Sequence, residues 1–460
     1  MKSLFRRPLI WFIAQAMGFA VWLWATGKFQ PVIAPDTNSY AAFSFNSVAA
    51  AFNQIRTIGY PAFLQFTSLL AEGHTAVPCC QYAIHVMCVL VFWLGSRNLF
   101  SSSWVSMAAA SSLLYSNVIF RYVFQVTADS LASSLSILTL GLLLLLNTRR
   151  PKTGLWIVFS LAVFATYQVR PAFLFLLPVL PFCGAIIKWM LHHPADKPSG
   201  ARRHLIRLGV CTTLPLLLFC SLRMVVSDHF GIVSFGGSNL AGTFGQFMTP
   251  DMISDLPKEL HPLAHAVEDQ RQHVAKKHPW FQPRVTLDYM DIERRFDLST
   301  WHVFIPAAEH VYGPDPRKTN TELRKLAFEV IKAKPSYYAL WLGKAFWRGS
   351  YMVVSEIMAN PVYLLLIALA ILIQMRYVFH RLKTVASAPE IATTDLFMGG
   401  NTMLGIGVVI AITKISLVIL TSPPIGRFMD PAGVFLAPAI VVFIADRWHR
   451  GSSCSRIAER

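Results

Sequence analysis

Charged side chains are scarce in this sequence. Asp, Glu, Lys and Arg make up 14% of its 460 residues, against about 25% in an average soluble domain. Hydrophobic residues make up 54%, and the mean hydropathy is +0.47. This composition excludes an intrinsically disordered chain and argues against soluble domains as the main part of the protein. We therefore expect a polytopic membrane protein.

Cysteine is also sparse, and its spacing forms no recognisable pattern. The chain has seven cysteines, none of them in a long polar segment at residues 227–360. They fit neither a disulfide framework nor a zinc site, so we expect them to be small buried hydrophobic residues. The sequence also lacks an internal repeat, although secondary transporters are commonly built from repeated halves.

The net charge of +17 could suggest nucleic-acid binding, but its distribution does not. Residues 227–356 contain 15 acidic and 15 basic residues, so the whole excess of positive charge lies among the apolar runs. It occurs in short clusters between those runs, which is the positive-inside pattern of bacterial-type membrane proteins. We expect no nucleic-acid partner, because phosphate-binding surfaces need a contiguous basic face.

Ten apolar runs are candidates for membrane spans, each of which needs about 20 residues. The predicted spans are residues 8–26, 77–94, 104–120, 127–146, 155–169, 171–191, 208–226, 361–378, 398–420 and 433–444. With a cytoplasmic N-terminus, every strongly basic connector falls on the cytoplasmic side, and so does the C-terminus. The predicted fold is an all-α polytopic membrane protein with about ten transmembrane helices.

This topology divides the chain into three parts. Residues 1–226 form an N-terminal membrane module with seven spans, residues 227–360 an extracytoplasmic segment, and residues 361–460 a C-terminal module with three spans. In the polar segment, residues 319–322 have the pattern of a helix start, and an apolar stripe follows them. We predict a mostly helical soluble segment there.

Four acidic residues fall on the predicted outer side outside the polar segment: Asp36, Glu72, Asp129 and Asp430. Acids near the membrane are costly unless they have partners, so each is a candidate for function. Asp36 precedes a predicted interfacial helix in the first outer loop. The alternative is that Asp36 has no role in function and only caps the start of that helix.

Four arginines fall on the same side: Arg56, Arg121, Arg170 and Arg427. Arginine is the favoured bidentate partner for a phosphate. For Arg56 the alternative is an ordinary anchor at the membrane surface. A carboxylate that takes a proton from a hydroxyl, beside cations that hold a phosphate, is what transfer from a lipid phosphate requires.

In their order along the chain, these motifs resemble the GT-C membrane glycosyltransferases. Relatives of that family include protein O-mannosyltransferases, lipid A aminoarabinose transferases and galacturonosyltransferases. The resemblance rests on Asp36-Thr-Asn-Ser-Tyr40, Arg56-Thr-Ile-Gly-Tyr-Pro61, Thr127-Ala-Asp-Ser-Leu131, Val169-Arg-Pro171, Lys334-Pro-Ser-Tyr-Tyr338 and Gly426-Arg-Phe428.

The resemblance implies transfer of a sugar from a polyprenyl-phosphate donor, with inversion, on the outer face of the bacterial inner membrane. The acceptor would be a hydroxyl of a glycan, a lipid or a protein. By position, Asp36 matches the general base, and Asp129 matches a second acid that binds the acceptor or a metal. The residues expected to bind the donor phosphate are Arg56, Arg427, Arg170 and Arg121, and those expected to bind substrate are Tyr40 and Tyr60.

A metal requirement and two other functions remain open at this stage. No cofactor is assigned, and a divalent cation, Mg²⁺ or Mn²⁺, is the candidate. Many family members carry an Asp-Glu pair in the first loop, whereas Thr37 follows Asp36 here, which argues against a metal. The alternative functions are a lipid-linked sugar flippase or other transporter, and a polysaccharide polymerase or ligase. The early acid of the first loop favours the glycosyltransferase.

Overall fold

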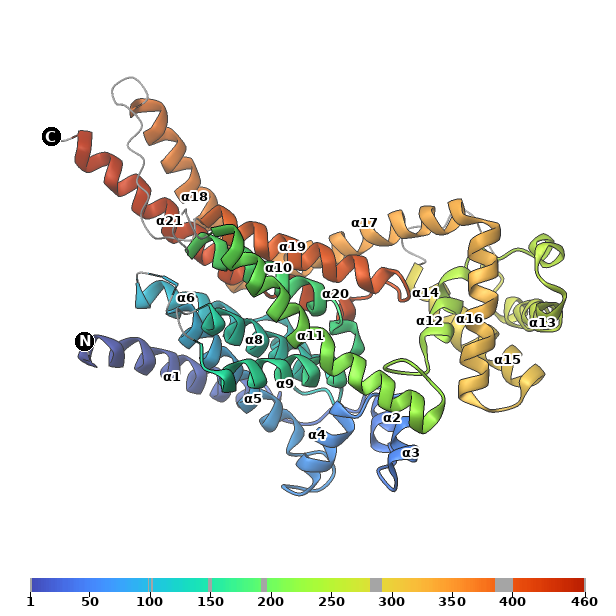
Figure 1. The fold of residues 1–460 in the computed structure, drawn as a ribbon. Helices are drawn as coiled ribbons and strands as arrows, with labels where there is room; N and C mark the ends of the chain where they lie inside the picture. Colours follow the sequence, from blue (N-terminus) through green and yellow to red (C-terminus); the bar gives the residue numbers. More distant parts are fainter. Residues whose placement is uncertain are drawn as a thin grey trace.

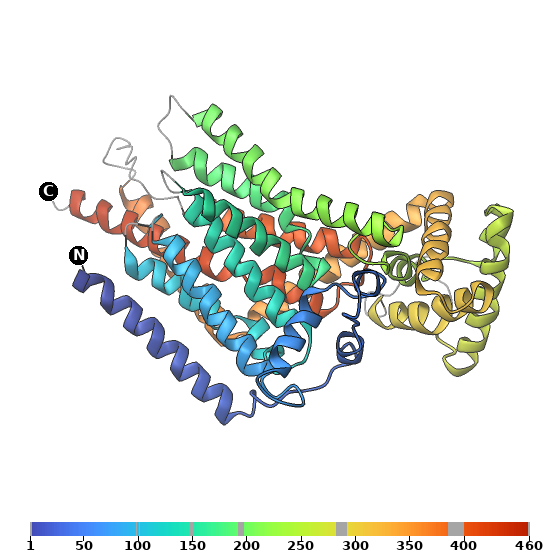
Figure 2. The ribbon, with the colours of Figure 1, turned by 60° about the horizontal axis from the view of Figure 1, so that its bottom comes forward.

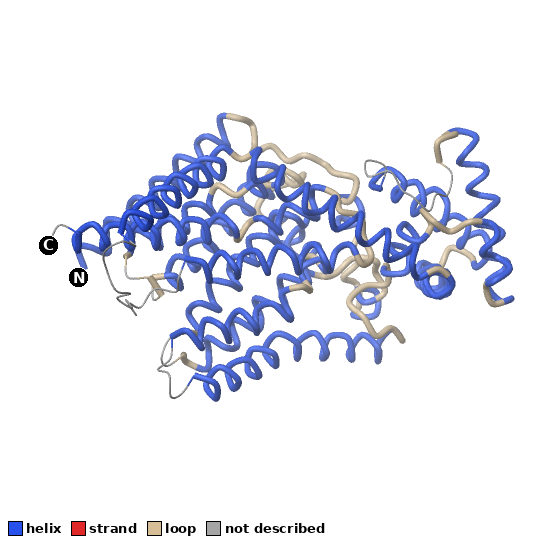
Figure 3. Tube along the Cα trace, turned by 90° about the horizontal axis from the view of Figure 1, so that it is seen from above, coloured by secondary structure: helices blue, strands red, loops and turns tan. Residues whose placement is uncertain are grey.

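Helices form nearly all the regular structure in this protein. The computed structural model describes residues 2–97, 99–100, 102–147, 151–191, 197–281, 292–384 and 400–458. Within these ranges the only extended pairing is an isolated parallel bridge between Val32 and Gln125. Figure 3 shows the long helices running side by side, with irregular connections mostly at one end.

Within those ranges, eight apolar helical segments are long enough to cross a membrane. Their main helices are α1 (Lys2–Ala25), α5 (Val77–Ser96), α8 (Ala128–Leu146), α10 (Leu176–Leu191), α11 (Lys197–Ser227), α18 (Pro361–Thr384), α19 (Gly400–Ile419) and α21 (Leu436–Ala458). Their length and composition confirm the predicted all-α polytopic membrane fold.

Two predicted spans differ from the helices that form. Residues 104–120 fold as two helices, α6 (Ser103–Leu114) and α7 (Asn117–Tyr122), because Ser116 adopts an extended backbone between them. The carbonyl of Tyr115 at this break accepts a hydrogen bond from Asn360 Nδ2 at 2.9 Å. Residues 155–169 form α9 (Thr153–Val169), which is apolar but has only 17 residues.

Close helix packing at the centre of the bundle depends on glycine. A side chain at Gly95 of α5 would lie 2.4 Å from the carbonyl oxygen of Gly141 in α8, and one at Gly141 would lie 2.6 Å from the backbone of Phe92. Small residues let membrane helices approach closely, which increases their van der Waals contact. The pair α5 and α8 is therefore a rigid base for the residues at its ends.

Three short helices lie in the connection between α1 and α5. They are α2 (Thr37–Ala41), α3 (Val48–Phe52) and α4 (Gly59–Ser68). Helix α3 begins at Ser47, whose side-chain oxygen accepts a hydrogen bond from the backbone N–H of Ala50 at 3.0 Å, as expected for an N-cap. The predicted interfacial helix is thus divided, and Arg56 lies in the connection before α4.

The polar segment folds into short helices at one end of the bundle (Figure 1). They are α12 (Gly236–Phe244), η3 (Pro250–Asp255), η4 (Lys258–Leu260), α13 (His261–Lys277), α14 (Ile292–Asp297), η5 (Leu298–Phe304), α15 (Ile305–Tyr312) and α16 (Pro316–Ala333). Their core includes the buried residues Phe244, Leu263 and Leu323. Helical structure in this segment agrees with the sequence.

Helix α17 (Pro335–Ala359) joins the soluble segment to the bundle. Its residue Trp341 belongs to the same buried cluster as Ile415 of α19 and Met429 of α20 (Gly426–Gly433). Both chain termini lie at the opposite end of the bundle from the soluble segment (Figures 1 and 2). Connections at the end that carries the polar segment therefore lie at the opposite end of the bundle from the termini.

Candidate active site

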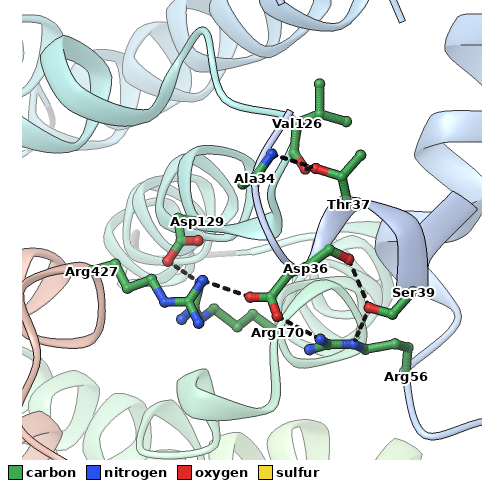
Figure 4. Close-up of polar contacts among 9 residues, drawn as sticks. All are labelled: Ala34, Asp36, Thr37, Ser39, Arg56, Val126, Asp129, Arg170 and Arg427. Atoms are coloured by element: carbon green, nitrogen blue, oxygen red, sulfur yellow. Dashed lines mark hydrogen bonds and ion pairs between the residues drawn. The ribbon is translucent and has the colours of Figure 1, made fainter. Parts of the chain in front are cut away.

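The Asp36 carboxylate joins two arginines from opposite ends of the chain. Its Oδ1 accepts a hydrogen bond from Arg56 Nη2 at 2.7 Å, and its Oδ2 accepts one from Arg427 Nη1 at 2.6 Å (Figure 4). Charge-assisted contacts of this length are among the stronger hydrogen bonds in proteins. The side chains of Asp36, Arg56 and Arg427 are 21%, 25% and 32% exposed, so a ligand can reach them.

Asp36 begins α2, but its side chain makes no capping hydrogen bond. The simple cap considered from the sequence is therefore not its role. Ser39 instead donates a hydrogen bond to the Asp36 carbonyl oxygen at 2.7 Å. Ser39 thus contacts the backbone of Asp36, while the carboxylate of Asp36 contacts Arg56 and Arg427.

Besides Asp36, two residues hold the Arg56 side chain in place. Its Nε donates to Ser39 Oγ at 2.8 Å, and its guanidinium lies 4.7 Å from the ring centre of Tyr40. A cation over an aromatic face is favourable. The motif continues to Gly59, where a side chain would lie 2.5 Å from the backbone of Gln168. Gly59 thus lets the Arg56 loop pack directly on the end of α9.

A second ion pair lies beside the first (Figure 4). Asp129, in the first turn of α8, accepts a hydrogen bond from Arg170 Nη1. The position before Pro171 disfavours helical backbone, and Arg170 is extended between α9 and the short helix η1 (Pro171–Phe173). The carboxylate is 2% exposed and the arginine side chain 11%, so this pair lies deeper than Asp36.

Backbone contacts fix the first loop against the segment that precedes Asp129. The N–H of Val32 donates to Phe124 O at 2.8 Å, and the N–H of Val126 donates to Val32 O at 3.0 Å. The hydroxyl of Thr37 also donates to Val126 O at 2.9 Å (Figure 4). This bridge joins the segment that leads to Asp36 to the segment that leads to Asp129, so it restrains their relative positions.

A buried amide of α5 supports the same segment from the other side. Gln81 is 0% exposed, and its Nε2 donates to Val123 O at 2.9 Å and to Gln125 O at 3.1 Å. Buried backbone carbonyls need such partners. The segment that precedes Asp129 and α8 is therefore held by both α5 and the loop that carries Asp36.

Arginine charges keep the Asp36 carboxyl ionised. Burial alone raises the pKa of this carboxyl, but the charges of Arg56 and Arg427 outweigh burial and hold the pKa below its ordinary value. Asp36 is therefore ionised at neutral pH. The guanidinium groups of Arg56 and Arg427 are partly exposed, and such groups are favoured partners for a phosphate.

Arg121, expected from the sequence to bind the donor phosphate, lies elsewhere, and so does the candidate acid Asp430. Arg121 contacts Glu356 Oε1 at 2.5 Å and lies 3.9 Å from Asp430 Oδ2. Asp430 follows Arg427 by one turn of α20 and accepts a hydrogen bond from Tyr122 at 2.6 Å. Arg121 is thus part of a neighbouring group of contacts, and does not pair with Asp36.

Tyr40 and Tyr60, the two residues expected to bind substrate, are both buried, at 7% and 0% exposed. Tyr40 lies under the guanidinium of Arg56, and Tyr60 packs edge-on against the Tyr40 ring at 4.9 Å between centres. Tyr40 therefore borders the ion pairs directly, whereas Tyr60 contacts them only through Tyr40.

Three further residues lie near the site without having been assigned from the sequence. Burial raises the pKa values of Glu293 and Asp297 on α14, and the charge of Arg427 opposes the rise at both, which places them near that arginine. No local pattern distinguishes these acids from others in the polar segment. Lys414 of α19 is the third, and its position inside an apolar run is the one signal that marks it.

In this structure the carboxylates Asp36 and Asp129 are paired with arginine and do not converge on a common position. Mg²⁺ and related cations need several oxygen ligands, whereas Asp36 and Asp129 are each paired with arginine. Among the residues that the structure describes, no three His, Cys, Asp or Glu side chains gather as a metal site would require.

Comparisons with known proteins give one distant likeness. No family model and no curated protein matches the chain. Among solved structures, a match is found to the "Crystal Structure of ArnT from Cupriavidus metallidurans bound to Undecaprenyl phosphate". It covers 98% of this chain and 79% of that chain, with 13% sequence identity and a TM-score of 0.37. So distant a likeness establishes neither a family nor a function for this chain.

Proposed function

We propose that this protein is a membrane glycosyltransferase that moves a sugar from a polyprenyl-phosphate donor to an acceptor hydroxyl. The observation that carries the proposal is the Asp36 carboxylate held between Arg56 and Arg427. It combines a proton acceptor with two phosphate-binding cations in one partly exposed site of a polytopic membrane protein. The motif order that resembles the GT-C glycosyltransferases supports the same function.

The arginines have a dual role in the proposed reaction. When no donor is bound, the charges of Arg56 and Arg427 stabilise the ionised form of the Asp36 carboxylate, which makes it a weak base. A phosphodiester that binds to Arg56 and Arg427 competes with Asp36 for the same N–H groups. The carboxylate then loses part of its stabilisation, so its proton affinity rises at the moment when the donor is in place.

The bond changes follow from that arrangement. The acceptor oxygen attacks the anomeric carbon as its proton passes to Asp36, and the bond from that carbon to the phosphate oxygen breaks. The bonding electrons leave with the polyprenyl phosphate, whose added negative charge Arg56 and Arg427 stabilise. Attack from the face opposite the leaving group inverts the anomeric carbon. The sugar never bonds to the protein.

Asp129 and Arg170 complete the proposed site. Their ion pair is buried beside the Asp36 contacts, where Arg170 adds positive charge and Asp129 orients it. A glycan, lipid or protein acceptor would approach from the side of the soluble segment, where Glu293 and Asp297 lie near Arg427. The site would then face the periplasm, with both termini in the cytoplasm, as the positive-inside pattern predicts.

The test is donor turnover by purified protein in lipid nanodiscs. A polyprenyl-phosphate-sugar fraction extracted from bacterial membranes is supplied with the matching membrane glycans, and mass spectrometry follows the release of polyprenyl phosphate. Asp36→Asn keeps the shape of the side chain but removes the base, so turnover should fall by about 10²-fold or more. The matched control is Glu72→Gln, an exposed acid of another connector, which should turn over donor normally.

Three results would contradict the proposal. Full turnover by Asp36→Asn would remove Asp36 as the base. Transbilayer movement of the lipid-linked sugar without release of polyprenyl phosphate would indicate a flippase instead. Turnover only of a polyprenyl-pyrophosphate substrate would indicate a polymerase or ligase.

A further inference from the structure

Arg223 is buried at the Ser227 end of α11, although an arginine side chain stays charged in proteins. It is 1% exposed. Its Nε donates a hydrogen bond to Phe52 O at 2.9 Å. Its Nη1 donates to Gly231 O at 2.9 Å, and its Nη2 donates to Ser234 Oγ at 2.8 Å. One planar guanidinium thus holds three acceptors at once.

These contacts join two segments that are far apart in the sequence. Phe52 is the last residue of α3, whereas Gly231 and Ser234 lie in the connection from α11 to the soluble segment. The end of α11 that carries Arg223 lies beside α3 (Figure 1). Arg223 therefore fixes the end of α3 to the start of the soluble segment.

Helix α3 depends on contacts of this kind because it has only five residues, and so short a helix is unstable by itself. The ring of Phe52 packs edge-on against Phe219 of α11 at 5.4 Å between centres. Arg317 of α16 adds a second polar link, since its Nη1 donates to Asn53 Oδ1 at 3.1 Å and to Ser227 O at 3.3 Å. The position of α3 is thus determined by α11 and the soluble segment together.

Arg56 lies within residues 53–58, an irregular connection between α3 and α4. One end of this connection is fixed where Gly59 packs on the end of α9. The other end is fixed by the hydrogen bond from Arg223 to the last carbonyl of α3. A short connection with both ends fixed has few conformations open to it, so these contacts restrict where the Arg56 guanidinium can lie.

We propose that Arg223 is a positioning residue for Arg56, a role that rests on the proposed function of the site. By holding the end of α3, it keeps the Arg56 guanidinium in the place where it binds the donor phosphate. Less freedom is then lost when the donor binds. Through Gly231 and Ser234, Arg223 also couples the Arg56 loop to the start of the soluble segment.

Donor kinetics in nanodiscs test this role with Arg223→Met and Arg223→Lys. Methionine donates no hydrogen bond, so the loop must be ordered when the donor binds, and the KM for the donor should rise about tenfold. The kcat should stay within about twofold of wild type, because a bound phosphate holds Arg56 in place. Lysine offers one ammonium in place of the planar fork, so its KM should lie between those of wild type and methionine.

A double-mutant cycle with Arg56→Ala shows whether the two arginines act together. If Arg223 acts through Arg56, adding Arg223→Met to Arg56→Ala should raise the KM no further. The matched control is Arg207→Met, which changes an exposed arginine of the same helix. This variant should keep the KM and kcat of wild type.

Hydrogen exchange gives a readout that does not depend on turnover. The backbone amides of residues 53–58 should exchange faster in Arg223→Met and Arg223→Lys than in wild type, because local opening becomes easier. The amides of α13 in the same proteins should exchange at the wild-type rate. If Arg223→Met does not fold, the lysine variant serves for both measurements.

Failure of this inference differs from failure of the proposed function. A wild-type KM in Arg223→Met, or in Arg223→Lys where only lysine folds, would overturn the positioning role. Equal rises in KM with and without Arg56, a fall in kcat alone, or unchanged exchange at residues 53–58 would overturn it as well. A wild type that does not turn over the donor would instead overturn the proposed function, and hydrogen exchange would still decide whether Arg223 holds the loop.

Discussion

Arg56 and Arg427 hold the Asp36 carboxylate in this structure, and the proposed chemistry depends on their release of it. Contacts of 2.7 Å and 2.6 Å to one carboxylate lower its proton affinity, whereas a catalytic base works best with a pKa near the working pH. A donor phosphate resolves this conflict because it binds the same guanidinium groups, so the Asp36 carboxylate loses their contacts and its pKa rises. Donor binding and activation of the base are then one event.

Arg56→Ala tests the donor contact at the scale of one residue. Loss of a charge-assisted hydrogen bond to the phosphate costs about 2 kcal/mol, so the KM for the donor should rise about thirtyfold. Arg56→Lys should recover only part of this, because lysine lacks the planar fork. Kinetics over a range of donor concentrations give both values. An unchanged KM in Arg56→Ala would make Arg56 an anchor at the membrane surface.

The sequence predicted single site residues where a charged residue stands out beside an apolar run. Asp36, Arg56 and Arg427 are charges at the ends of apolar runs, and the structure brings them together. Arg121 is also a charge at the end of an apolar run, but it contacts Glu356. This contact forms because the C-terminal end of α17, which carries Glu356, packs near α7, which carries Arg121. The sequence does not predict that contact, since Glu356 lies in the polar segment, where charged residues are common and one acid does not stand out.

At the scale of elements, close backbone approach determines the geometry of the site. Gly59 at the start of α4 lies against Gln168 at the end of α9, directly before Arg170. The bridge between Val32 and Gln125 then joins the first loop to the start of α8. Neither contact follows from periodicity, because both depend on irregular backbone. The sequence likewise shows one span at residues 104–120, where α6 and α7 are separate.

Gly59→Ala tests this packing. The added carbon would lie 2.5 Å from the Gln168 backbone, and overpacking of this kind costs about 1–3 kcal/mol. The loop should shift, so donor turnover should fall. Gly343→Ala in α17 is the control, since nothing lies within 4 Å of its added carbon. Normal turnover by Gly59→Ala would show that the Arg56 loop tolerates displacement.

At the scale of the whole molecule, both termini lie at one end of the bundle and the Asp36 loop lies toward the other (Figures 1 and 2). The even number of membrane crossings that this requires could be predicted from the positions of the basic connectors. The same reasoning predicts that Asp36 lies on the extracytoplasmic side of the membrane. The packing of α17 along α19 and α20 could not be predicted, because α17 continues the polar segment in sequence.

Chemical labelling tests the predicted orientation. Asn38 is exposed in α2, so the cysteine in Asn38→Cys should react with a membrane-impermeant maleimide in spheroplasts. The unmodified chain, with its seven native cysteines, provides the background. Reaction only after the cells are broken would place the Asp36 loop in the cytoplasm and contradict the outer-face site.

The most direct measurement is a cryo-electron microscopy structure of the chain in nanodiscs with a polyprenyl phosphate bound. The account predicts that the phosphate contacts Arg56 and Arg427, that at least one of the two no longer pairs with Asp36, and that the carboxylate faces the space left for an acceptor. A phosphate bound elsewhere, with both arginines still on Asp36, would contradict it.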